Sequence, residues 1–179
     1  MSLRFAILTA LSEKSSSGIE LARRFDRSIG YFWPASHQQI YRELDTLLGD
    51  GLIEQLDDGT PPSRGNPRTF RVTADGTAAL RAWAGRLEDR PKVRDALMVR
   101  IRAAAALSDV DPRAALEHRL ATHERTLEAY EAIDARQFTG PLNRAARLQR
   151  QVLRAGIASE RMWVAWCRDA LAELDRAES

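Results

Sequence analysis

Apolar residues recur at helical spacing in the N-terminal part of the chain, and they predict three helices there. The first covers residues 3–12, the second covers residues 18–29, and the third begins after a turn that contains Gly30 and Pro34. A helix that buries one face repeats its apolar positions every three or four residues. The residues that we expect to face the core are Leu3, Ile7, Leu11, Ile19, Leu21, Ala22, Phe25, Ile40, Leu44, Leu47 and Leu48.

The third predicted helix has start and stop signals at its two ends. Ser36 stands at the expected N-cap, and Gln39 follows three residues later, which is the capping-box pattern. Gly49 and Gly51 are expected to end the helix, because glycine tolerates the backbone conformation found just after a helix.

Two short stretches after this helix have the pattern of β-strands. LIEQLD at 52–57 and RTFRVT at 68–73 predict a pair of strands, with Phe70 and Val72 on alternate positions. The stretch between them is rich in Pro, Gly, Ser and Asn, so we expect a hairpin with a long tip. This hairpin forms a two-stranded wing beside the three helices.

The pattern is helical almost throughout the rest of the chain, where Ala, Leu, Arg and Glu dominate. We expect breaks at residues 89–91 and 139–141. The expected helices cover about 77–88, 93–107 and 112–135, and a long one runs from the second break to about 175. The predicted fold class is therefore mainly α with a small β-hairpin wing. We expect residues 1–88 to form one domain, with the three helices and the wing, and residues 89–179 to form a second, helical domain.

Composition and charge limit the possible classes of protein. The 179 residues are 44% hydrophobic and 29% charged, as in a soluble globular protein, and no apolar run reaches the roughly 18 residues of a membrane span. The single cysteine, Cys167, excludes an intramolecular disulfide and favours a reducing, cytoplasmic location. A net charge of +2 says little about partners, so a nucleic-acid surface would have to arise from the placement of charges.

Catalytic patterns are missing from the sequence. The chain has three histidines and one cysteine, without Cys-Cys spacing for zinc and without a glycine-rich phosphate loop after a strand. The carboxylates of Asp57 and Asp58 lie together, but at a turn. We therefore expect no enzyme activity, no cofactor and no metal site.

The polar face of the third helix is typical of a DNA reader. At 100° per residue, Gln38 and Arg42 point away from the aliphatic side, with Gln39 and Tyr41 on the flanks. Gln can pair with adenine, and Arg with guanine or phosphate. Ser36, Gln38, Gln39, Tyr41 and Arg42 are the contacts that we predict, although such a face is also common on helices that meet only solvent.

The tip of the hairpin offers a second contact with DNA. Arg64, Asn66 and Arg68 lie close together there, and an arginine on such a tip can enter a minor groove. An ordinary solvated loop is the alternative for this segment. Of the remaining candidates near the third helix, we expect structural or supporting roles for Tyr31, Trp33 and His37.

The two long C-terminal helices have apolar seams that need a partner helix or a second chain. One seam contains Leu116, Leu120, His123, Leu127 and Tyr130, and the other contains Trp163, Trp166, Ala170 and Leu174. This surface favours a homodimer, which would bind an inverted-repeat site. His123, Met162, Trp163 and Trp166 could instead line a pocket for a small aromatic effector, but tryptophans at this spacing more often belong to a core or interface. We expect Cys167 to be buried and inert.

The sequence resembles the PadR family of bacterial transcriptional regulators. In the N-terminal half the resemblance lies in GIELARRF, QIYRELDTLLGDGLIE and RTFRVTADGTAAL. In the C-terminal half RDALMVRIRAAAAL and LRAGIASERMWVAWCRDAL resemble the helical domain of the longer, virulence-activator-alpha subfamily. The sequence departs from the family at Ile19, where an aromatic residue is common, and at Asp57 and Asp58, where the family's wing is often more basic.

This resemblance implies a winged helix-turn-helix that binds operator DNA as a homodimer through its long C-terminal helices. We therefore expect residues 1–88 to be the DNA-binding domain and residues 89–179 to be a helical dimerisation domain, which could also sense an effector. We therefore expect a sequence-specific transcriptional regulator, a repressor acting on an inverted repeat. A winged-helix module that binds proteins without contacting DNA is the alternative. The operator, the regulated genes and the effector do not follow from the sequence.

Overall fold

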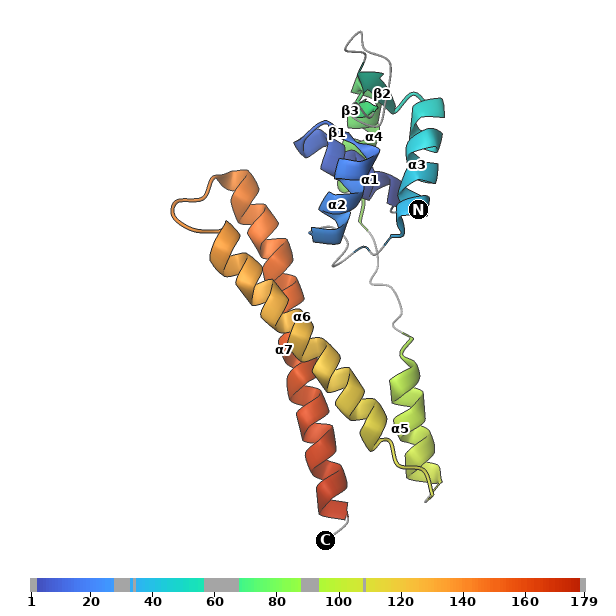
Figure 1. Ribbon diagram of the computed structural model, residues 1–179, viewed down its shortest axis with the longest axis vertical. Helices are drawn as coiled ribbons and strands as arrows, with labels where there is room; N and C mark the ends of the chain where they lie inside the picture. Colours follow the sequence, from blue (N-terminus) through green and yellow to red (C-terminus); the bar gives the residue numbers. More distant parts are fainter. Residues whose placement is uncertain are drawn as a thin grey trace. The chain divides into compact units, whose positions relative to one another are not determined.

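A computed structural model describes residues 3–27, 33, 35–56, 68–87, 94–107 and 109–177 of the chain. The chain divides into two compact units, Met1–Arg90 and Pro91–Ser179. Figure 1 shows helices and a small sheet in the first unit and helices alone in the second. The mainly helical fold with a small wing, expected from the sequence, is confirmed.

The first unit contains four helices and a three-stranded antiparallel sheet within its described residues. The strand order is β1-β3-β2, so the predicted hairpin of β2 and β3 carries one additional strand at its edge. In order along the chain the elements are α1 (Leu3–Glu13), β1 (Ser16–Ser17), α2 (Gly18–Arg27), α3 (His37–Gly49), β2 (Ile53–Leu56), β3 (Thr69–Val72) and α4 (Ala74–Ala84).

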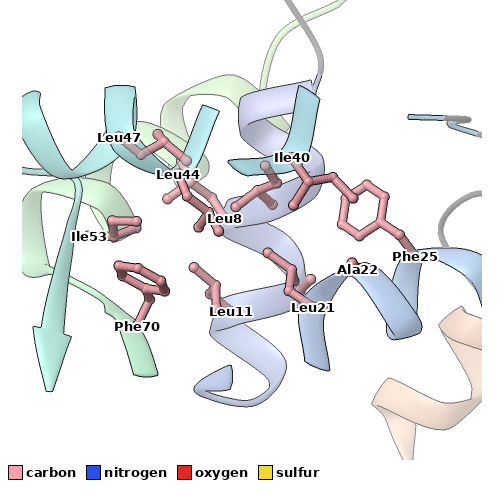
Figure 2. Close-up of a cluster of buried hydrophobic side chains, with 12 residues drawn as sticks. Leu8, Leu11, Leu21, Ala22, Phe25, Ile40, Leu44, Leu47, Ile53 and Phe70 are labelled. Atoms are coloured by element: carbon pink, nitrogen blue, oxygen red, sulfur yellow. The ribbon is translucent and has the colours of Figure 1, made fainter. Parts of the chain in front are cut away.

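The core of this unit is built from one face of each of the first three helices and the inner face of the sheet. Figure 2 shows side chains from α1, α2 and α3 meeting those of β2 and β3. Burying each large aliphatic side chain contributes about 1.5–3 kcal/mol, and this burial fixes which face of α3 is left outside. The buried residues include Ile7, Leu8, Leu11, Leu21, Phe25, Ile40, Leu44, Leu47, Ile53 and Phe70.

The expected inward position of Ile19 is wrong. Its side chain is 46% exposed, whereas Leu21, Ala22 and Phe25 of the same helix are buried as expected. At 100° per residue Ile19 lies roughly 115° from the centre of the stripe that these three residues form. The sequence pattern included it because it is apolar and only two residues from Leu21.

Strand β1 was not predicted, because its two residues are serines and have no apolar alternation. Ser16 pairs with Phe70 and Ser17 with Thr69 of β3, and both serines are 1% exposed. The start of α4 also differs from prediction, since Thr73 caps a helix that begins at Ala74 rather than near residue 77. The first turn of α4 requires glycine at position 76, because a Cβ there would clash with the Leu52 carbonyl oxygen.

The second unit contains α5 (Ala96–Ala106), α6 (Arg113–Gln137) and α7 (Arg144–Ala177). Helices α6 and α7 lie side by side and run in opposite directions (Figure 1). Gly140, in the turn between them, has φ +70°, so glycine suits this position. The buried residues of this unit include Leu97, Leu116, Tyr130, Ile157, Val164 and Cys167.

Candidate nucleic-acid interface

The N-terminus of α3 is held by the predicted capping box. The Ser36 hydroxyl accepts a hydrogen bond from the Gln39 backbone N–H at 3.3 Å, and the Gln39 side-chain oxygen accepts one from the Ser36 backbone N–H at 2.8 Å. Both side chains are therefore occupied in fixing the start of the helix. Gln39 retains only its amide NH₂ group for an outside partner.

Three neighbouring side chains on α3 are exposed and uncommitted. Gln38, Tyr41 and Arg42 face solvent, and their side chains make no hydrogen bond or ion pair with any residue in the described ranges. An amide, a phenol and a guanidinium on one capped helix match the groups that read base edges and phosphates in a major groove. The structure thus presents the donors that the helical projection predicted.

Acidic residues in α3 and at its C-cap would repel DNA, and two of them, Glu43 in the helix and Asp50 at the cap, form ion pairs with Arg4 of α1. Arg4 Nη2 lies 2.5 Å from Asp50 Oδ2, and Arg4 Nε lies 3.3 Å from Glu43 Oε1. The second distance suits an ion pair, but the N–H is not aligned for a hydrogen bond. Asp45 is exposed on the same helix. Arg4 therefore offsets part of the negative charge close to the uncommitted side chains.

The wing is described only at its base. Arg71 of β3 forms an exposed ion pair with Glu54 of β2, at 2.6 Å, and Arg68 is exposed just before β3. The predicted tip contacts, Arg64 and Asn66, lie outside the described residues.

Two predicted supporting residues near α3 are exposed instead. His37 faces solvent in the first turn of α3, although the projection placed it nearer the apolar side. Trp33 is 37% exposed. Helix α3 buries its face through Ile40, Leu44 and Leu47, so the residues before its second turn are left outside the core. Tyr31 lies outside the described residues.

In the second unit the structure brings together three of the four predicted effector residues. The rings of His123 and Trp163 stack with centroids 5.5 Å apart, and Trp166 meets Trp163 edge-on at 5.6 Å. Met162 is 52% exposed and takes no part in these ring contacts. Arg119 also lies 5.6 Å from the Trp163 ring centroid, so two side chains of α6 already lie against this ring.

The ion pairs beside this cluster were not predicted from the sequence. Asp95, the N-cap of α5, accepts two hydrogen bonds from Arg119, at 2.9 and 3.0 Å, and one from the Leu97 backbone N–H. His123 Nδ1 lies 2.5 Å from Glu160 Oε2. The only sequence signal was Asp95 standing before an apolar run, as N-caps do. Nearby Cys167 is buried as expected, and burial raises the pKa of its thiol, which disfavours the thiolate form.

No group of three potential metal ligands occurs among the residues that the structure describes. A search of the helices in these same ranges finds none with the length and apolar character needed to cross a membrane.

Two family models match successive parts of the sequence. Residues 7–82 match the transcriptional regulator PadR-like family, and residues 93–175 match the virulence activator alpha C-terminal domain. A probable transcriptional regulator of Mycobacterium tuberculosis is 38% identical, with 97% of each chain covered. The negative transcriptional regulator PadR of Bacillus subtilis is 26% identical, with 97% of this chain and 98% of that protein covered.

Solved structures of similar fold cover both units as well. AphA, a virulence activator of Vibrio cholerae, superposes with a TM-score of 0.83 at 31% identity, over 98% of this chain and 99% of that chain. Bacillus subtilis PadR in complex with operator DNA gives a TM-score of 0.82 at 24% identity, over 97% of this chain and 98% of that chain. The same regulator has also been solved in complex with p-coumaric acid.

Proposed function

The chain belongs to the PadR-like family of transcriptional regulators, and from this premise we propose that it binds operator DNA as a homodimer and represses transcription. This family consists of regulators rather than enzymes. The observation that carries the proposal is the set of uncommitted side chains on the capped helix α3, namely Gln38, Tyr41 and Arg42. The operator complex of Bacillus subtilis PadR supports the choice of duplex DNA as the partner. A cytoplasmic location is part of the proposal, because the regulator has to reach this DNA.

In this proposal α3 enters the major groove with its first two turns. Gln38 pairs with a base edge, Arg42 contacts guanine or a phosphate, and Tyr41 contacts the backbone. Ser36 and Gln39 hold the helix start, which also directs free backbone N–H groups and a partial positive charge toward phosphates.

The wing supplies the flanking contact through Arg64, Asn66 and Arg68. Of these three, Arg68 is the one within the described ranges, and it is exposed at the base of the wing. The remaining two stay predictions from the sequence.

The homodimer rests on an exposed stripe along α7. Leu148 is 53% exposed, Val152 49% and Met162 52%, and Ala155 and Ser159 lie between them at spacings of three and four residues. Such a stripe is apolar enough to pack against a second helix. A second copy is the occupant that we propose, and its two-fold symmetry requires an inverted repeat with half-sites one or two helical turns apart.

A small aromatic effector is the second partner in the proposal, supported by the p-coumaric acid complex of Bacillus subtilis PadR. The candidate contacts are His123, Met162, Trp163 and Trp166. Because His123 and Arg119 already lie against Trp163, an aromatic ligand that stacked where they do would compete with these two side chains. Such a ligand can regulate only by binding one arrangement of the two DNA-binding heads more tightly than another.

Selection of duplexes from random DNA at about 150 mM salt tests the proposal, since screening at this concentration removes much non-specific attraction. We expect an inverted repeat, and we expect Gln38→Ala and Arg42→Ala to weaken binding to it by about tenfold or more. Arg176→Ala is the matched control, because this arginine is 75% exposed at the far end of α7.

The outcomes separate the candidate functions. Recovery of no sequence by a folded protein, with no effect of either α3 variant, would favour the protein-binding module. Recovery of an operator whose occupation raises transcription would favour activation, the role named for AphA, over repression.

A further inference from the structure

The N-terminus of α2 lies directly against the ring of Tyr41 on α3. Gly18, the first residue of α2, is buried, and a Cβ placed on it would lie 3.1 Å from Tyr41 Cζ and 3.2 Å from Cδ1, with Cε1 closer still. Real Cβ atoms do not approach a neighbour so closely, so one of the two residues would have to move. The ring of Tyr41 thus packs on a surface that only glycine provides.

Glycine is required at position 18 because there is no room for a Cβ, and not because of the backbone conformation. The glycines with positive φ in the described ranges are Gly51 and Gly140, and Gly18 is not among them. An alanine could therefore adopt the backbone conformation of Gly18 without strain. The three nearest atoms that a Cβ would meet all belong to the aromatic ring that covers it.

The backbone around Gly18 is fixed from two sides, so it cannot move away from the ring. Ser17 pairs with Thr69 through the β1–β3 ladder. The Glu20 carboxylate accepts hydrogen bonds from the Ser17 backbone N–H, at 2.9 Å, and from the Ser17 hydroxyl, at 3.1 Å. A side chain at position 18 would consequently push on Tyr41, which is the more mobile of the two.

Tyr41 is the residue through which this contact can matter for function. It is 43% exposed, and its hydroxyl group has no hydrogen-bond partner within the ranges that the structure describes. It flanks Gln38 and Arg42 on the proposed DNA-reading face. A ring packed on one side and free at its hydroxyl has little conformational freedom left to lose when it binds.

We propose that Gly18 is a positioning residue for DNA recognition: it seats the Tyr41 ring so that the phenol hydroxyl donates a hydrogen bond to a backbone phosphate of the operator. The inference rests on the proposed function and adds the partner group of Tyr41 and the residue that sets its orientation. Phosphate contacts of this kind fix the register of a protein on its duplex. Gly18 lies on α2 and Tyr41 on α3, so this contact also sets the spacing between the two helices.

A double-mutant cycle tests whether Gly18 positions the Tyr41 ring. The variants are Gly18→Ala, Tyr41→Ala and the double variant, with affinity measured on the selected operator and thermal unfolding followed by circular dichroism. We expect Gly18→Ala to weaken binding by about three- to tenfold, the size of one lost hydrogen bond, and Tyr41→Phe to weaken it similarly. In the Tyr41→Ala background the Gly18→Ala change should cause no further loss, because no ring remains to be displaced.

Two controls distinguish positioning from general destabilisation. Gly49→Ala is the matched glycine control, since nothing lies within 4 Å of a Cβ at Gly49, and it should leave affinity unchanged. Gly18→Ala should lower the unfolding temperature when Tyr41 is present and not when it is alanine. If Gly18→Ala alone fails to fold, recovery of folding in the double variant reports the same coupling.

The contrary outcomes are distinct. Equal losses from Gly18→Ala in both backgrounds, or wild-type affinity in Gly18→Ala, would overturn the inference. Wild-type affinity in Tyr41→Phe would exclude the proposed hydrogen bond from the Tyr41 hydroxyl to a phosphate. The wild-type protein and Gly49→Ala could both bind no DNA while the unfolding temperatures still show coupling between Gly18 and Tyr41. In that case the proposed function fails, and the contact between Gly18 and Tyr41 has only a structural role.

Discussion

His123 and Glu160 join the two long helices of the second unit through a direct contact, with Nδ1 2.5 Å from Oε2. Both side chains are 15% exposed, and the imidazole also stacks on Trp163. In this hydrogen bond the imidazole N–H is the donor and the carboxylate oxygen the acceptor. This pair therefore fixes the alignment of α6 and α7 at one position, beside the aromatic cluster.

Replacement of this histidine should destabilise the second unit. His123→Phe keeps a ring that can stack on Trp163 but leaves the Glu160 carboxylate without its donor, so we expect a loss of about 1–3 kcal/mol in the free energy of unfolding. Urea unfolding followed by circular dichroism measures this. Glu173→Gln is the control, because the Glu173–Arg176 pair is more than 70% exposed on both sides, at 72% and 75%. Equal effects of the two changes would contradict the assigned role.

Stability should decrease in acid partly through Asp95. The hydrogen bonds from the Arg119 guanidinium and from the Leu97 backbone N–H hold the pKa of Asp95 below its ordinary value of 3.8. Because the folded state lowers this pKa, the stabilisation is complete above about pH 5 and is lost as the pH falls through the folded value. Asp95→Asn should therefore be less stable than the wild type at pH 7, with a difference that shrinks toward about pH 2.

Unfolding free energies measured across this pH range test the Asp95 prediction. Asp134 provides a comparison, since the hydrogen bonds of Arg150 lower its pKa in the same way. A difference between wild type and Asp95→Asn that stays constant with pH would exclude the ionised carboxylate as its source.

Arg24 should be more important for stability than its exposed neighbour Arg23. Its Nη1 donates to the Lys14 carbonyl, just after the end of α1, at 3.1 Å, and at 2.8 Å to the Ala10 carbonyl, which also accepts from the Lys14 backbone N–H. Carbonyls at a helix C-terminus lack partners within the helix. We expect Arg24→Ala to cost about 1.5–3 kcal/mol in the free energy of unfolding and Arg23→Ala to stay within about 0.5 kcal/mol. Chemical denaturation of both variants measures the difference. Similar values would mean that the hydrogen bonds from Arg24 to these carbonyls contribute little to stability.

The α7 stripe should be sensitive to charge if it is a dimer interface. Val152→Asp places a carboxylate in its middle, so we expect a shift toward monomer in sedimentation velocity with the helical content unchanged. Leu87→Asp is the control, because Leu87 is fully exposed and lies outside α7. A dimer that persists in Val152→Asp at the same protein concentration would place the interface elsewhere.

Local patterns in the sequence were sufficient for most elements and for the orientation of α3. The capping box of Ser36 and Gln39, and the positive φ of Gly51 just after the helix, depend on residues within a few positions of each other. The apolar spacing of Ile40, Leu44 and Leu47 settles which face is buried. Consequently the outward direction of Gln38 and Arg42 could be predicted before any tertiary contact was known.

Tertiary structure alone decided the features that join distant segments. Strand β1 exists because Ser16 and Ser17 find partners on β3, and two serines have no strand pattern of their own. Ile19 is exposed because the core reaches only the other face of α2. The close packing of Tyr41 on Gly18 depends on how two helices cross, and such a crossing is set by the whole core. Local sequence specifies helices, strands and caps because their hydrogen bonds are local, whereas contacts between elements depend on packing that no short stretch encodes.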